Sequence, residues 1–141
     1  MKFRYLKFNL KEPSEILGKA VLKPIIPIRL KFRNSSLRYV ALIDLGADFY
    51  IFDAPIGEYL GIDITTGKKE EFGGIQNRGK AFAYFHKVTI EIRGWDYQII
   101  AGFSYDIAKR GYGVLGQKGF FENFIVKFNL LKEEVELKPR K

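Results

Sequence analysis

The sequence predicts a mostly β fold with one or two short helices, and three observations support this class. Apolar and polar residues alternate over the long segments 80–93 and 95–103, as they do in half-buried strands. Short clusters of glycine, asparagine and serine separate such segments. Patterns typical of helices are confined to 56–60 and 117–122. With 141 residues, of which 47% are hydrophobic, the chain is most simply one globular domain with a sizeable core.

The first third of the chain predicts two strands. The segment 21–32 has Pro24 and Pro27 near its start and then alternates, which indicates a strand that begins at a sheet edge. A turn at 34–36 follows it. The apolar run over 37–43 is expected to form a buried strand.

A short helix is expected next. Asp53 is a suitable helix cap, and Pro55 fits the first turn of a helix. The helix covers 56–60, and Gly61 is expected to end it.

Two long strands joined at Arg93-Gly94 dominate the second half. In each strand the expected core-facing residues are every second residue and so lie on one face: Phe82, Tyr84, His86, Val88, Ile90 and Ile92 in the first, then Trp95, Tyr97, Ile99, Ala101 and Phe103 in the second. The glycine-dense segment 111–116 is expected to be a bend and 117–122 a short helix. Strands are expected around 124–128 and 135–137, separated by a turn.

The composition excludes several classes of protein. The chain has no cysteine, so it has neither disulfides nor thiolate zinc ligands, which fits a reducing compartment. No stretch approaches the roughly 18 apolar residues of a membrane span, and the first residues lack the apolar core of a signal peptide. We therefore expect a cytoplasmic protein that does not contact membranes.

The net charge of +8 is spread along the chain, and only the tail 138–141 is a basic cluster. Because no compact stripe of lysine and arginine is visible, we interpret the charge as a solvated surface and do not expect nucleic acid as a partner. A nucleic-acid-binding β domain that uses aromatic residues such as Tyr84 and Trp95 is a minor alternative, since these residues alternate as core residues do.

Two glycine-rich segments match phosphate-binding motifs, but their context argues against both. Gly74–Lys80 fits a P-loop up to the residue that must offer a hydroxyl to magnesium, and Ala81 has none. Gly111–Gly116 fits a dinucleotide fingerprint, but a polar segment precedes it and only 25 residues follow. His86, the one histidine, alternates with core residues and is expected to be a satisfied strand residue. Carboxylate chemistry is what the chain can still supply.

Asp44 is the candidate catalytic residue. It follows the apolar run 39–43, and Gly46 lets the backbone turn tightly beside it. One carboxylate is a poor catalyst of amide hydrolysis, whereas two about 3 Å apart share a proton and act as base and acid on one water. The chain has one Asp-x-Gly turn, so a carboxylate pair requires two copies around a two-fold axis.

The segment Ala41–Asp48 resembles the active-site signature of retropepsin-like aspartic peptidases, usually Asp-Thr-Gly-Ala or Asp-Ser-Gly-Ala. Val114-Leu115-Gly116 is similar to the second hallmark of that family, two apolar residues and a glycine that lead into a short helix. The turn 72–79 falls where the family has its flap. The resemblance assigns 21–138 to a retropepsin-like domain, 1–20 to an N-terminal arm or strand and 139–141 to a basic tail.

The resemblance implies a single-lobed closed β-barrel with one or two short helices and a hairpin flap, which dimerises to complete an aspartic endopeptidase site. Asp44 and its two-fold mate would hold the nucleophilic water, without metal or organic cofactor, and act on a peptide or protein substrate. The other implied site residues are the turn residues Leu45, Gly46, Ala47 and Asp48, the flap residues Phe72, Gly73, Gly74, Ile75 and Gly79, and the supporting residues Val114, Leu115 and Gly116. The end strands, within 1–10 and 135–137, are implied to contribute to the dimer sheet.

Leu45 departs from the signature. The family has a threonine or serine there, whose hydroxyl braces the paired turns across the two-fold axis. Losing that partner costs roughly 1–3 kcal/mol per buried unsatisfied group, while two leucines meeting at the axis recover about 2 kcal/mol each by burial. Gln117 likewise stands where many relatives have an arginine that pairs with the acid at the Asp48 position. Two functions therefore stay open: an active endopeptidase, or a weakened or inactive relative that binds peptides or proteins as a dimer.

Overall fold

The computed structural model describes residues 1–73, 80–107 and 110–140. The strands are β1 (Lys2–Arg4), β2 (Leu6–Ser14), β3 (Gly18–Lys23), β4 (Ile25–Phe32), β5 (Ser35–Ile43), β6 (Tyr50–Asp53), β7 (Lys68–Phe72), β8 (Ala81–Ile92), β9 (Trp95–Ser104), β10 (Gly113–Leu115), β11 (Phe124–Asn129) and β12 (Glu134–Pro139). The helical segments are α1 (Ala54–Tyr59), η1 (Ile64–Thr66) and η2 (Gln117–Phe121). Within these ranges no helix is long and apolar enough to cross a membrane.

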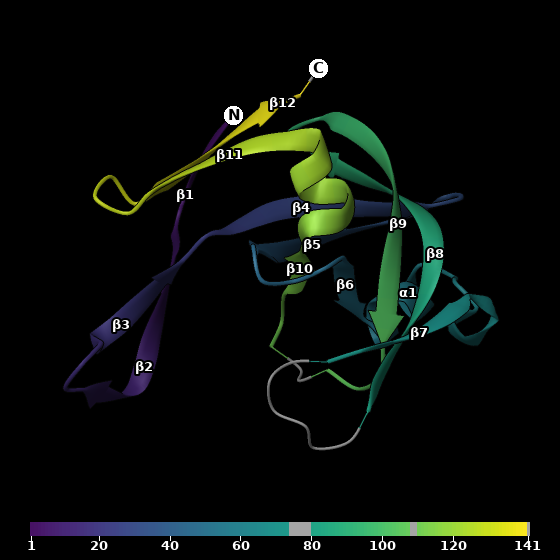
Figure 1. Ribbon diagram of the computed structural model, residues 1–141, viewed down its shortest axis with the longest axis horizontal. Coiled ribbons are helices and arrows are strands. Elements are labelled where there is room, and N and C mark those ends of the chain that lie inside the picture. Colours follow the sequence, from purple (N-terminus) through teal and green to yellow (C-terminus); the bar gives the residue numbers. More distant parts are fainter. Residues whose placement is uncertain (74–79, 108–109, 141) are drawn as a thin grey trace.

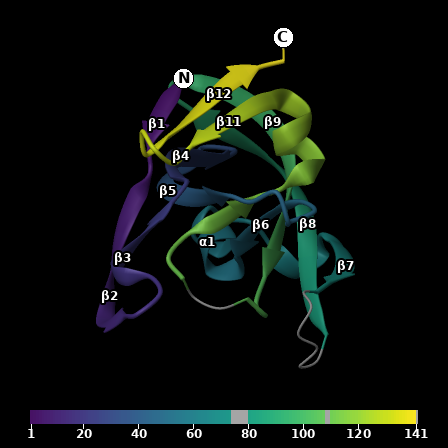
Figure 2. The same cartoon turned by 60° about the vertical axis from the view of Figure 1, so that its left-hand side comes forward.

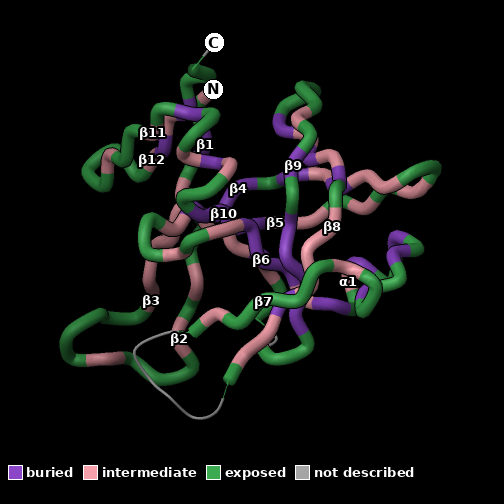
Figure 3. The backbone as a smooth tube through the Cα atoms, turned by 45° about the vertical axis from the view of Figure 1, so that its right-hand side comes forward, coloured by how far each residue is buried: buried purple, intermediate pink, exposed green. Residues whose placement is uncertain are grey.

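A closed β-barrel forms the body of the molecule, as predicted (Figure 1). Hydrogen-bonded neighbours run in the order β4-β5-β10-β6-β9-β8, pairing of β8 with β4 closes the ring, and β7 adds to the edge of β8. Because successive strand residues alternate between the two faces, one set of side chains fills the interior. Its fully buried members include Ile26, Leu30, Phe52, Ile90, Ile92, Ala101, Phe103 and Leu115. Figure 3 shows buried stretches of β4, β5, β6 and β9 gathered at the centre.

Two boundaries in the first third differ from the prediction. The expected strand over 21–32 is divided at Pro24 into β3 and β4, because proline has no N–H to continue a ladder. The carbonyl of Pro24 instead accepts the Ile43 N–H at 3.0 Å. The expected turn at 34–36 begins one residue earlier, at Arg33 with a φ of 52°, and Ser35 already belongs to β5.

The predicted helix after Asp53 is confirmed as α1. Asp53 occupies the cap position, but its side chain makes no capping hydrogen bond. Gly61 follows the helix with a φ of 89°, a conformation that glycine adopts without strain. Tyr105, after β9, donates its hydroxyl to Glu58 at 2.6 Å, and this hydrogen bond raises the pKa of Tyr105 to about 12.

The segment expected to be a glycine-rich bend, 111–116, contains the strand β10 instead. Its backbone pairs with β5 on one side and β6 on the other. The prediction was wrong because strand formation here comes from the two flanking strands and not from local preference.

The helix expected over 117–122 is present but interrupted. Gly119 has a φ of 93°, and neither Gly119 nor Lys118 has helical backbone angles. The Gly119 N–H donates to Glu122 Oε1 at 2.7 Å, and this bond lowers the pKa of the Glu122 carboxyl. The Glu122 side chain therefore supplies a hydrogen-bond acceptor at the point where η2 is interrupted.

The long hairpin β8–β9 turns at Arg93-Gly94, as predicted. The expected core residues Val88, Ile90, Ile92, Ile99, Ala101 and Phe103 are buried. The expectation for Trp95 is wrong: its side chain is 68% exposed, because it occupies the last pair of the ladder, next to the turn. His86 is half-buried, and its ring Nε2 lies 2.8 Å from the Ile64 carbonyl, so it is a satisfied strand histidine.

The chain ends lie together in a separate small sheet. Its order is β1-β12-β11, and Figure 1 places both termini beside it. Phe3 on β1 is buried, and the Met1 amino group donates to the Leu137 carbonyl at 2.9 Å. Among the strands that the structure describes, β2 and β3 pair only with each other, and their hairpin stands out to one side of the barrel (Figures 1 and 2). The division of the chain at residue 20 stays a prediction.

Gly57 on α1 provides a test of the packing between helix and barrel. A Cβ at this position would lie 2.6 Å from Ile64 Cδ1 and 2.8 Å from the Phe103 ring. We expect Gly57→Ala to lower the free energy of unfolding by about 1–3 kcal/mol through overpacking, although alanine favours helix by up to about 1 kcal/mol. Urea unfolding measures the change. The matched control is Tyr59→Ala, at an exposed position of the same helix. An unchanged midpoint for Gly57→Ala would contradict the packing described.

Candidate active site

The turn 44–48 joins β5 to β6, and β10 lies between these two strands. β10 runs parallel to β5, with Leu115 opposite Ile43, and antiparallel to β6, with Val114 opposite Ile51. The connection from β5 to β6 must therefore pass over the end of β10. The turn that carries Asp44 packs against the segment that follows β10, residues 116–118.

Hydrogen bonds join the turn to this supporting segment. The backbone bonds are Asp44 N–H to Leu115 O at 3.0 Å, Gln117 N–H to Ala47 O at 2.8 Å and Lys118 N–H to Asp48 O at 2.7 Å. The Gln117 side chain adds a bond from Nε2 to the Leu45 carbonyl at 2.8 Å. Gln117 thus bonds the backbone of the turn.

Gly116 lies directly against the turn. A Cβ at this position would come within 2.5 Å of the Phe49 carbonyl oxygen and 2.7 Å of the Ala47 carbonyl oxygen. Both contacts are to backbone atoms, which cannot rotate away as a side chain can. Only glycine therefore allows the turn and the segment after β10 to approach this closely.

The Asp44 carboxylate is half-buried and oriented by its own turn. Its Oδ1 accepts the Gly46 N–H at 2.8 Å, and its backbone carbonyl accepts the Ala47 N–H at 3.2 Å. Among the residues that the structure describes, no protein donor contacts its Oδ2. One oxygen is thus held in place while the other is free to bind water, a substrate or a second carboxylate.

A hollow of about 280 Å³ lies beside this carboxylate. Its walls come from the turn and the start of β6, from the end of β7 and from the segment around β10: Asp44, Gly46, Ala47, Asp48, Phe49, Ile51, Phe72, Gly73, Ile107, Arg110, Tyr112 and Val114. Residues from all three predicted motifs therefore meet around one space. Leu115 and Gly116 are buried beneath the turn, whereas Leu45 points away and is 57% exposed. Gly74, Ile75 and Gly79 of the expected flap lie outside the described residues.

Five residues of the hollow were not predicted as site residues: Phe49, Ile51, Ile107, Arg110 and Tyr112. Tyr112 also accepts a bond from Lys23 Nζ at 3.4 Å, and its ring lies 6.2 Å from that of Phe8 on β2. Phe49 and Ile51 lie just after the predicted turn 44–48, and this short distance in sequence was the available signal for them.

A metal centre finds no support in the described ranges. They contain no group of three or more histidine, cysteine, aspartate or glutamate residues placed to hold an ion. The chemistry that the hollow can offer is that of its carboxylates, Asp44 and Asp48, and the Arg110 guanidinium.

Comparison with solved structures identifies the architecture. The crystal structure of a retropepsin-like aspartic protease from Rickettsia conorii matches with a TM-score of 0.56 and 15% identity, covering 79% of this chain and 88% of that chain. The chain has a retropepsin-like fold. The EIAV protease complexed with the inhibitor HBY-793 matches with a TM-score of 0.45 and 20% identity, covering 77% and 86%. No protein-family profile and no curated protein matches the sequence.

Gln117 provides a test of how the turn is held. We expect Gln117→Ala to lower the free energy of unfolding by about 0.5–1.5 kcal/mol, because the Leu45 carbonyl loses its donor. Amide hydrogen exchange of 44–48 should become faster in this variant. The matched control is Lys118→Ala, whose side chain makes only an exposed ion pair with Glu122 at 3.4 Å. Equal exchange rates in the two variants would show that the Gln117 amide does not stabilise the turn.

Proposed function

We propose that two copies of this chain form an aspartic endopeptidase in which a pair of Asp44 carboxylates activates the attacking water. The observation that carries this proposal is the Asp44 carboxylate itself. Within a retropepsin-like barrel, it borders the hollow that Phe72 and Gly73 also line. Its Oδ1 is bonded to Gly46, and its Oδ2 has no donor among the described residues. No metal or organic cofactor is needed for this chemistry.

In the proposed dimer the two carboxylates share one proton, because two adjacent negative charges repel each other strongly. The ionised carboxylate takes a proton from water as the water oxygen bonds to the peptide carbonyl carbon. The protonated carboxyl gives its proton to the carbonyl oxygen. The peptide nitrogen then accepts a proton from one carboxyl while the other carboxylate takes a hydroxyl proton from the tetrahedral intermediate. The C–N bond breaks, which leaves a carboxylic acid, an amine and a pair that again holds one proton.

Leu45 supports the dimer and also argues for a second candidate function. An exposed leucine beside a polar turn favours burial against another chain, and a two-fold axis near Asp44 would bring two copies of Leu45 together. The same residue cannot donate the hydroxyl bond that braces the turns in the resembling family. A displacement of about 1 Å is enough to weaken catalysis severely. The second candidate is therefore a dimer that binds peptides or proteins in the same hollow without cutting them.

Asp44→Asn tests the catalytic proposal directly. We expect the native chain to cleave a denatured protein mixture with an acidic to near-neutral optimum, because the pair must hold one proton. Asp44→Asn removes the ionisable groups and should abolish cleavage. Mass spectrometry of the released peptides measures the activity. Cleavage that persists in Asp44→Asn would exclude Asp44 as the catalytic group.

Leu45→Thr separates the two candidate functions. Restoring a hydroxyl at this position should tighten the carboxylate pair and raise kcat of an already active chain. If the native chain is inactive and Leu45→Thr gains activity, the native protein is a binding dimer. Leu45→Val is the matched control, since valine resembles threonine in shape and lacks the hydroxyl.

A further inference from the structure

Basic side chains gather on the outer face of β4, β5 and β8, away from the hollow beside Asp44. Arg29 and Lys31 alternate with the buried residues of β4, so both point outward. Arg38 on β5 is the direct cross-strand partner of Arg29, and Glu91 on β8 is its partner on the other side. Like charges placed directly opposite each other destabilise a sheet, so the pairing of Arg29 with Arg38 lowers the stability of the fold.

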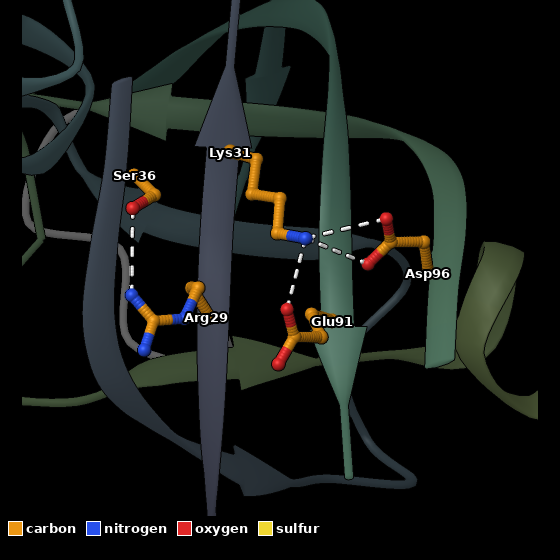
Figure 4. Close-up of polar contacts among 5 residues, drawn as sticks. All are labelled: Arg29, Lys31, Ser36, Glu91 and Asp96. Atoms are coloured by element: carbon orange, nitrogen blue, oxygen red, sulfur yellow. Dashed lines mark hydrogen bonds and ion pairs between the residues drawn. The ribbon is translucent and has the colours of Figure 1, made fainter. Parts of the chain in front are cut away.

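Two carboxylates on this face are already paired with Lys31 (Figure 4). Lys31 Nζ lies 2.9 Å from Glu91 Oε1 and 3.1 Å from Asp96 Oδ1. The hydrogen bonds that Lys31 donates to these two carboxylates raise its pKa, with Glu91 the larger cause, and so keep Lys31 charged. The acids of this patch therefore neutralise the lysine and not the arginines.

The arginines are left without carboxylate partners within the described ranges. Arg29 makes only a long bond to Ser36 Oγ, at 3.4 Å (Figure 4), and Arg38 is exposed. Arg93 lies over the Phe3 ring at 4.2 Å and donates to the Lys2 carbonyl at 2.6 Å, which fixes its position. With Pro27 and Ile28, these arginines and Glu91 line a shallow hollow of about 210 Å³.

We propose that Arg29, Arg38 and Arg93 form an exosite that binds an acidic segment of a polypeptide substrate. The term substrate rests on the proposed endopeptidase function, and the exosite adds the charge class of that substrate. Guanidinium groups bind carboxylates in a bidentate manner, and the hollow gives a glutamate or aspartate side chain a place to lie between them.

An acidic peptide fits this face better than a nucleic acid does. Binding of single strands depends on exposed aromatic rings on which bases stack. Two rings beside the patch are covered by arginines: Phe3 by Arg93, and Phe32 by Arg33 at 5.0 Å. These two rings are therefore not available for base stacking, whereas the guanidinium groups can bind carboxylates.

The strand β5 sets the distance between the exosite and the carboxylate. Arg38 lies on β5 and Asp44 is the first residue after it, six positions further along, which is about 20 Å at the usual rise per residue. An extended peptide needs about six residues to cover that distance. The preferred acidic cluster should therefore lie at least about six residues from the bond that is cut.

Binding tests this exosite independently of cleavage. The full chain carrying Asp44→Asn is titrated with a fluorescent glutamate-rich peptide, its glutamine counterpart and a single-stranded oligothymidylate. Adding Arg29→Gln with Arg38→Gln should weaken binding of the acidic peptide about tenfold or more. The control adds Lys127→Gln with Lys132→Gln, two exposed lysines elsewhere that give the same loss of two charges. It should change binding less than about twofold.

The outcomes separate this proposal from the proposed function. Equal losses in the two pairs of variants, or tighter binding of the oligothymidylate than of the acidic peptide, would overturn the exosite. If the native chain cleaves an acidic substrate and the double variant Arg29→Gln with Arg38→Gln has the same KM, the exosite is also overturned, and the endopeptidase proposal is unaffected. Selective loss of peptide binding together with an absence of any cleavage would support the exosite and remove the endopeptidase.

Discussion

The position of β10 between β5 and β6 is the constraint on which the candidate site depends. This three-residue strand completes the barrel by pairing with both neighbours, and Leu115 anchors it in the core. The backbone that follows it, at Gly116, fits directly under the turn that carries Asp44. Barrel closure and the placement of the carboxylate therefore rest on the same segment. A shift of the turn would have to break the pairing of β10 with β5 and β6. The position of the Asp44 carboxylate is therefore fixed by the same backbone hydrogen bonds that close the barrel.

That support comes from within one chain, which bears on the missing hydroxyl at position 45. A threonine brace across a dimer axis depends on the partner subunit, whereas the bond from Gln117 Nε2 to the Leu45 carbonyl forms inside the subunit. The turn thus has a donor for the backbone beside Asp44 before any dimer forms. Gln117 and the backbone hydrogen bonds orient the turn. The exposed Leu45 side chain can therefore contribute to association of two chains through its burial, without having to orient the turn. This bond to a backbone carbonyl does not depend on which side chain residue 45 carries.

The sequence predicted those strands and turns that are determined by residues close together in the chain. Alternation gave the strands β8 and β9, and Asp44 with Gly46 indicated a tight acidic turn at the end of an apolar run. Features that need distant partners could not be predicted. β10 exists because two other strands flank it, and Trp95 is exposed because the ladder ends there. The spread of charge along the sequence concealed the arginine cluster, since Arg29, Arg38 and Arg93 come from separate segments that only the barrel brings together.

Arg38 lies on β5 and Asp44 directly follows the end of that strand, which links charge recognition to the site of cleavage in the proposed enzyme. A strand paired on both sides within a closed barrel cannot stretch or bend appreciably, so the separation of the two residues is fixed. Binding an acidic segment at one end would set the register of the substrate at the other. The position of the acidic segment in the substrate would then determine which peptide bond lies over the carboxylates. An enzyme that selects the bond by its distance from the acidic segment needs little recognition of side chains inside the hollow of about 280 Å³. The rigidity that closes the barrel would in this way also determine where a substrate is cut.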